Sequence, residues 1–135
     1  MKSITLCGST SFYGEMPEIR GRLTALGFKV LTPELNDELS DYSALAQDDA
    51  ARKKNYFIAR HLPKIQQADA ILVVNRKKKG IEGYIGPNVF LEMGFAFAFG
   101  KPIFLLTTVP EQENKEEILG LLPRVINGDL GKIAL

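Results

Sequence analysis

Two absences narrow the class of protein at once: the sequence has almost no cysteine and no long apolar segment. Cys7 is the only cysteine among the 135 residues, so an intramolecular disulfide is impossible. The longest apolar stretches, residues 89–99 and 103–106, are too short to cross a bilayer, and Glu92 interrupts the first. The N-terminal residues also lack the pattern of a signal peptide. We therefore predict a cytoplasmic protein that does not contact the membrane.

The sequence also lacks an excess of charge of either sign. It carries 17 Lys and Arg against 16 Asp and Glu, which leaves a formal net charge of +1. This balance argues against bulk electrostatic binding to a nucleic acid polymer or an anionic membrane, although a local basic patch remains compatible with it. Apolar residues make up 45% and charged residues 24%, as in a globular protein, so residues 1–135 are predicted to form one domain.

Several chemical motifs are missing as well. The sequence contains neither a Gly-x-Gly-x-x-Gly fingerprint nor a P-loop, so it does not predict dinucleotide or triphosphate binding by those modes. No His, Cys and carboxylate residues have the spacing of metal ligands, and no nucleophilic triad can be argued. We therefore predict no metal and no cofactor.

Four short apolar runs alternate with segments of helical character. The runs are near-continuously apolar, as buried parallel strands are, and the strongest, at residues 70–74, is apolar on both faces. Strands are predicted at residues 4–7, 28–31, 70–74 and 102–106, and helices from about 17 to 26, from 48 through 65, from 88 to 99 and from 113 to 122. A fifth, edge strand is predicted at either 125–126 or 132–135.

Two segments of this pattern are less regular. Residues 34–47 are polar and acidic without a period, which predicts a long loop of the kind that often covers a binding site. In the following helix the predicted core stripe is Ile58, Leu62 and Ile65, and Pro63 falls inside it. Proline cannot donate a helical hydrogen bond, so we expect a kink or a break there.

Alternating strands and helices predict an α/β fold: a flavodoxin-like, doubly wound parallel sheet of four to five strands in three layers. In such sheets a ligand binds outside the carboxyl ends of the strands, at a topological switch point. The loops after the first, third and fourth strands should meet there.

The predicted helix at residues 88–99 is apolar nearly all round, with Glu92 as its single acid. A capping box would need the acid three residues after the cap, and Glu92 is four after Asn88. One remaining interpretation is a structural ion pair with a buried partner. The other is a desolvated carboxylate that acts as a nucleophile or stabilises an oxocarbenium-like sugar carbon.

Polar residues and glycines follow the first predicted strand, and further candidates come in the loop after the third. Exposed backbone N–H groups and hydroxyls just before a helix suit a phosphate or a sugar, although an ordinary turn has the same composition. The candidates for ligand contact are Gly8, Ser9, Thr10, Ser11, Tyr84, Gly86 and Asn88. The basic run at residues 76–79 is either a solvated loop or an attractor for anionic substrates.

At residues 83–102 the sequence reads GYIGPNVFLEMGFAFAFGKP, which resembles the signature of the nucleoside 2-deoxyribosyltransferase superfamily. That group also contains deoxynucleoside 5'-monophosphate N-glycosidases. The segment QADAILV at residues 67–73 is similar to the one that opens the third strand of the family. Cys7-Gly8-Ser9 resembles the loop that meets the sugar and the 5'-phosphate in the monophosphate branch. The resemblance extends from about Thr5 to Leu106.

The resemblance implies that Glu92 is the nucleophile that attacks C1' of a nucleoside or nucleotide. Three positions depart from the family pattern: His61 stands where a catalytic aspartate is usual, Thr5 replaces an orienting tyrosine, and Gly86 replaces a serine or aspartate. A lone helical histidine is most often solvated, but His61 flanks the predicted core stripe. The alignment makes it a candidate for the group that protonates the departing base.

Three functions follow as hypotheses. The first is cleavage or transfer at the N-glycosidic bond of a (deoxy)nucleoside or nucleoside 5'-monophosphate through Glu92. The second is a nucleotide-binding module of the same fold without turnover, and the third is NAD glycohydrolysis. In each case the apolar helix around Glu92 is expected to pack partly against another subunit of a homodimer or higher homo-oligomer.

Overall fold

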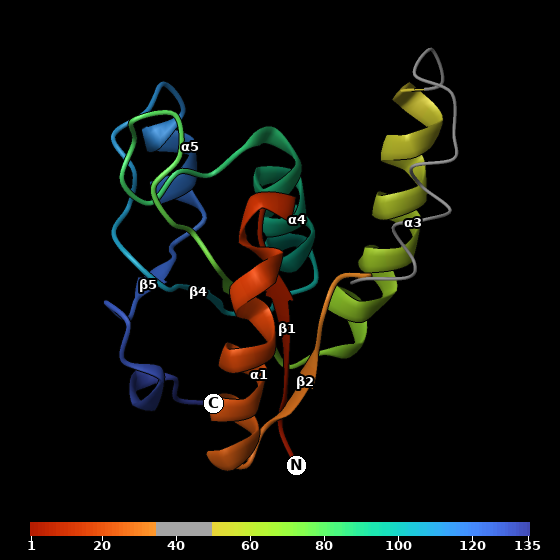
Figure 1. Ribbon diagram of the computed structural model, residues 1–135, viewed down its shortest axis with the longest axis vertical. Coiled ribbons are helices and arrows are strands. Elements are labelled where there is room, and N and C mark those ends of the chain that lie inside the picture. The colour runs from red at the N-terminus through yellow and green to blue at the C-terminus, as the bar shows by residue number, and fades with distance from the viewer. Residues whose placement is uncertain (35–49) are drawn as a thin grey trace.

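The computed structural model describes residues 1–34 and 50–135, which form a central sheet flanked by helices (Figure 1). The strands are β1 (Ser3–Cys7), β2 (Lys29–Leu31), β3 (Ala70–Val73), β4 (Ile103–Leu105) and β5 (Arg124–Val125). The α-helices are α1 (Met16–Ala25), α3 (Ala50–Gln67), α4 (Pro87–Ala98) and α5 (Lys115–Gly120). Two short 3₁₀ helices are η1 (Thr10–Glu15) and η3 (Leu130–Lys132).

All strands pair in parallel, in the order β2-β1-β3-β4-β5. This is the flavodoxin-like order, and it confirms the predicted fold class. After β2 the chain crosses over β1 to reach β3, so the order reverses between β1 and β3. Their carboxyl ends therefore form the switch point at which this fold binds ligands.

The sheet separates two apolar cores, which gives three layers. Side chains alternate along each strand, so neighbouring residues enter opposite cores. On one face, α1, η1 and the C-terminal segment pack against Leu6, Leu72 and Phe104. On the other face, α3, α4 and α5 pack against Cys7 and Val73. Figure 1 shows α1 and α4 on opposite sides of β1, with α3 beside α4.

The structure departs from the predicted elements in two places. The edge strand is β5, so the prediction at 125–126 is confirmed in place, while the alternative at 132–135 is wrong because Lys132 ends η3 and no strand follows it. Of the kink or break expected at Pro63, the break is wrong, since α3 continues from Ala50 to Gln67, and the kink stays a prediction. Ala59 and Pro63 are both exposed, so water can satisfy the carbonyl that proline leaves without a donor.

The predicted loop at 34–47 and the predicted helix start at 48–49 lie outside the described residues, except for Glu34. The helix η1 was not predicted; Ser9 caps it by accepting a hydrogen bond from the backbone N–H of Ser11. Within residues 1–34 and 50–135, every helix is too short or too polar to pass through a bilayer.

Candidate active site

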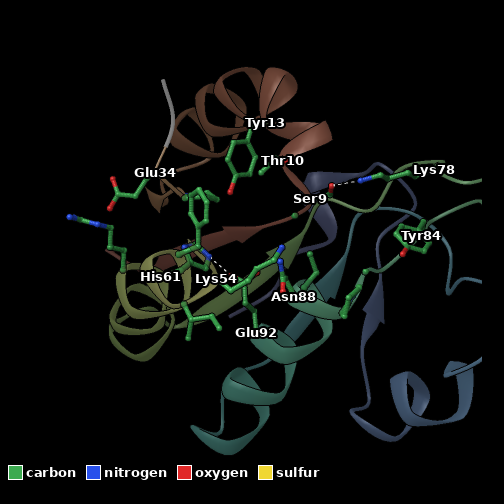
Figure 2. Close-up of a pocket in the computed structure, with 18 of the residues that line it drawn as sticks. Ser9, Thr10, Tyr13, Glu34, Lys54, His61, Lys78, Tyr84, Asn88 and Glu92 are labelled. Carbon is green, nitrogen blue, oxygen red and sulfur yellow. Dashed lines mark hydrogen bonds and ion pairs between the residues drawn. The ribbon is translucent and has the colours of Figure 1, made fainter. Parts of the chain in front are cut away.

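A cavity of about 330 Å³ opens at the carboxyl ends of β1 and β2, beside α3 and the N-terminus of α4. Figure 2 shows its side chains converging from these separate elements. Its lining includes most of the residues predicted to contact a ligand: Gly8, Ser9, Thr10, His61, Tyr84, Gly86, Asn88 and Glu92. Ser11 is exposed and lies outside this lining, where its backbone takes part in the η1 cap.

Glu92 lies in the second turn of α4, whose N-cap is Gly86. The acid is therefore too far along the helix to cap its first N–H groups. Helical side chains point back toward the N-terminus of their helix, so the carboxyl of Glu92 is directed at the cavity, which lies beside the N-terminus of α4. Only 16% of the side chain is exposed. The structure thus excludes the capping interpretation and leaves a carboxyl buried against one partner.

That partner is His61, from the facing side of α3. The Nε2 atom of His61 lies 3.0 Å from Oε2 of Glu92 (Figure 2), and 3.5 Å from Sγ of Cys7. The histidine is 6% exposed, so it is not the solvated residue that a lone helical histidine usually is. Its Nδ1 is buried, with no hydrogen-bond partner of standard geometry among the described residues.

Burial shapes the electrostatics of this pair. Desolvation raises the pKa of Glu92 to about 8. Desolvation, with a smaller contribution from the charge of Lys64, lowers the pKa of His61 to about 4, against an opposing effect of the Leu6 backbone. Burial, reinforced by Glu92, also raises the pKa of the Cys7 thiol well above its usual value. At neutral pH the favoured state is therefore a neutral carboxyl hydrogen-bonded to a neutral imidazole.

Thr5, at the position where the resemblance implies an orienting tyrosine, makes a hydrogen bond to α3 instead. Its Oγ1 donates a 2.7 Å hydrogen bond to the backbone carbonyl of Lys64, near the C-terminal end of α3. The Nζ of Lys64 in turn donates to the Thr32 carbonyl and to Glu34. Thr5 therefore anchors the helix that carries His61, rather than contacting Glu92.

The cavity has a cationic side. Lys78 donates a 2.9 Å hydrogen bond from Nζ to Oγ of Ser9, joining the basic loop to the turn after β1 (Figure 2). Lys79 lies 5.5 Å from the ring centroid of Tyr84. The other two cations of the loop do not line the cavity, because they reach Glu15 and Glu82 instead. The lining also contains Lys54 and Arg60 of α3, which the sequence did not single out.

Asn75, at the carboxyl end of β3, holds the loop that contains Tyr84 in place through hydrogen bonds. This side chain is 1% exposed. Its Nδ2 donates to the carbonyls of Gly83 and Thr108, and its Oδ1 accepts from the N–H of Thr107. Gly83 has φ +70°, and a Cβ there would lie 2.5 Å from the Thr108 carbonyl oxygen, so only glycine fits. Neither residue was predicted as part of the site.

The sequence profile of the family described as Nucleoside 2-deoxyribosyltransferase matches residues 6–122 of this chain. The chain belongs to this family. The match includes Glu92, His61 and the turn after β1, and it confirms the family inferred from the signature at residues 83–102. Among proteins with curated functions, none is a significant match to the sequence.

Two solved structures of distant sequence support the same fold. One is a 2-deoxyribosyltransferase from Bacillus psychrosaccharolyticus, with 17% identity and a TM-score of 0.52 over 76% of this chain and 70% of that one. The other is a CMP N-glycosidase from Clostridium botulinum, with 18% identity and a TM-score of 0.53 over 95% of this chain and 90% of that one. At this level of identity the likeness extends to architecture, and the chemistry must be argued from the site.

Proposed function

We propose that this protein breaks the N-glycosidic bond of a nucleoside or nucleoside 5'-monophosphate, with Glu92 as nucleophile and His61 as proton donor to the base. The observation that carries the proposal is the 3.0 Å contact between these two buried side chains at the edge of the cavity. Membership of the nucleoside 2-deoxyribosyltransferase family supports the choice of bond.

In the first step, Glu92 passes its proton to Nε2 of His61 as the sugar carbon approaches. The other carboxyl oxygen then forms a bond to C1' while the bond from C1' to the base nitrogen breaks. The departing base takes the proton from His61, which becomes neutral again. The neutral pair thus holds in advance both the nucleophile and the one proton that the leaving group needs.

In the second step, water or a second base attacks C1' of the glycosyl ester, as in retaining glycosidases. The bond from C1' to the Glu92 oxygen breaks, and His61 accepts the proton of the attacking group. Return of this proton to the carboxylate restores the starting pair. Water as acceptor gives hydrolysis, and a second base gives transfer.

The cationic side of the cavity favours a phosphorylated substrate. Lys78 is already directed at Ser9, and backbone N–H groups after β1 are suited to anionic oxygens. Lys54, Arg60 and Lys79 add positive charge within the same lining. We therefore propose that a 5'-monophosphate binds beside Ser9 and Lys78, with Tyr84, Gly86 and Asn88 near the rest of the nucleotide.

The test is chromatographic detection of free base from purified protein. The substrates are deoxynucleosides, ribonucleosides, their 5'-monophosphates and NAD, each incubated with wild type, Glu92→Gln and His61→Gln. Base release that both substitutions abolish supports the proposal and names the substrate class. Release of nicotinamide alone identifies an NAD glycohydrolase. Release that is equal in wild type and Glu92→Gln rules out Glu92 as the nucleophile.

A nucleotide-binding module without turnover is the second candidate, and two observations favour it. A carboxyl with a pKa of about 8 is mostly protonated at neutral pH, and Thr5 cannot orient it as the family tyrosine would. This candidate predicts thermal stabilisation by a nucleotide without release of base. A ligand at 100 times its dissociation constant stabilises by about 2.7 kcal/mol, which a thermal shift assay detects readily.

We also propose that α4 contributes to a homo-oligomer. Leu91, Phe97 and Phe99 are 41%, 52% and 37% exposed, so the helix presents large apolar side chains to solvent in one chain. Burying these side chains between two subunits would remove them from water. Light scattering that gives the mass of a monomer at micromolar concentration would exclude this proposal.

A further inference from the structure

Cys7, His61 and Glu92 bring a sulfur, a nitrogen and an oxygen ligand together from three separate elements. These atoms all lie within 4.8 Å of one another. The distance from Nε2 to Sγ is 3.5 Å and from Nε2 to Oε2 is 3.0 Å. Tetrahedral zinc, with Zn–S of about 2.3 Å and Zn–N and Zn–O near 2.0 Å, places its ligand atoms about 3.3 to 3.5 Å apart. The two distances from Nε2 are therefore close to the edges of such a tetrahedron, and the third, from Sγ to the carboxylate, is no longer than 4.8 Å.

The three ligand atoms also surround a point at which a metal ion could bond to all of them. For separations of 3.5 Å, 3.0 Å and at most 4.8 Å, a point exists within about 2.4 Å of all three atoms, which is close to the length of a zinc–ligand bond. Nε2 of His61 is in contact with both other ligand atoms, so Nε2 is the nitrogen that would coordinate the metal. His61 and Glu92 line the cavity, so a fourth position for water lies on the open side.

Charge balance selects a divalent ion. A bound metal replaces the thiol proton of Cys7 and the carboxyl proton of Glu92, because coordinated thiols and carboxyls are deprotonated. With a neutral imidazole, the two anionic ligands cancel a charge of +2. The complex is then neutral, as the protonated residues are, so a buried environment tolerates both states.

From this arrangement we infer that Cys7, His61 and Glu92 form a site for a divalent transition-metal ion such as Zn²⁺, which reversibly blocks the cavity. Bound metal would occupy the oxygen and nitrogen atoms that the proposed reaction needs, so metal and substrate would exclude each other. The inhibitory part of the inference rests on the proposed function, whereas the binding site itself does not.

The experiment uses Co²⁺ as a spectroscopic probe on the full chain, after treatment with a chelator. Because Cys7 is the only thiol, a sulfur-to-cobalt charge-transfer band can arise from no other residue. We expect the band to saturate at one Co²⁺ per chain and to disappear on addition of Zn²⁺, which binds such ligands more tightly. Absence of the band at a tenfold excess of Co²⁺ overturns the inference.

Variants separate this site from adventitious binding. His61→Gln and Glu92→Gln should each weaken Co²⁺ binding at least tenfold, whereas Glu34→Gln, which removes a carboxyl elsewhere in the lining, should leave it unchanged. Zn²⁺ should also raise the Tm of wild type but not of Cys7→Ala. Equal Tm shifts in wild type and Cys7→Ala overturn the inference, as do unchanged Co²⁺ affinities in both glutamine variants. None of these readouts requires base release, so failure of the proposed reaction is seen separately.

Discussion

Replacing Glu92 by glutamine is predicted to change how the stability of the fold depends on pH. Glutamine keeps the shape of a protonated carboxyl and can still donate a hydrogen bond to Nε2 of His61, but it cannot ionise. In wild type the carboxyl has a pKa of about 8 instead of 4.5, and the imidazole has a pKa of about 4 instead of 6.5. Both shifts arise from burial, and both oppose charge.

The direction in which the free energy of unfolding changes with pH follows from the number of protons bound by the folded and the unfolded chain. Between pH 4.5 and 6.5 the folded pair holds one proton on Glu92 and the unfolded chain holds one on His61, so this pair adds no slope. Between pH 6.5 and 8 the unfolded chain holds none while the folded chain keeps its proton. Stability therefore falls as pH rises through this window. A slope of about 1.36 kcal/mol per pH unit, over about 1.5 units, gives a loss of about 2 kcal/mol.

Urea unfolding between pH 5 and 8.5, with a chelator present to keep metal out, measures this effect. We expect the midpoint of wild type to fall above pH 6.5, and the profile of Glu92→Gln to stay level over the same range. Glu82→Gln is the control, because that carboxyl is 72% exposed and its loss should leave the wild-type slope. A wild-type profile that is as level as that of Glu92→Gln would refute the argument from burial.

The other predictions concern the supports of the site and its pH profile. Asn75→Ala leaves three backbone groups without partners and should cost about 2–4 kcal/mol in urea unfolding, whereas Thr5→Val, which removes one donor, should cost about 1–2 kcal/mol. Gly83→Ala should destabilise the fold much more than Gly80→Ala; both glycines have positive φ, but a Cβ at Gly80 meets nothing within 4 Å. If base is released, kcat/KM should be highest between about pH 4 and 8, because the pair has exactly one transferable proton only there. Equal losses in the two glycine variants, or a kcat/KM that keeps rising above pH 8, would contradict these expectations.

The fold was predictable because the residues within each central strand are enough to identify it as a strand. The runs around Leu72 and Phe104 are apolar on both faces and bounded by turn residues, which fixes buried parallel strands. The edge strand β5 has only two residues, so no periodicity could decide between its two candidate positions. The passage of α3 through Pro63 depends on solvent at that turn, which a residue pattern does not record.

The site was only partly predictable, for a different reason. Glu92 is conspicuous as the one acid of an apolar helix, and its family signature is local. The burial of His61 is not local: the packing of α3 against α4 buries it, while Ile58 and Leu62 of the predicted core stripe remain half-buried. The contact of His61 with Cys7 likewise joins residues 54 positions apart in the chain. Spacing along the sequence therefore could not reveal the cluster.

The protonated state of Glu92 has a consequence for how a substrate arrives. A carboxylate at the floor of the cavity would repel an incoming phosphate, but a neutral carboxyl does not. The field that a phosphorylated molecule meets is then set by the lysine and arginine side chains of the lining, offset in part by Glu34 and screened by salt over about 8 Å at physiological ionic strength. Under the proposed function, capture of a phosphorylated substrate therefore depends on ionic strength, whereas the negative charge on Glu92 arises only when the carboxyl passes its proton to His61.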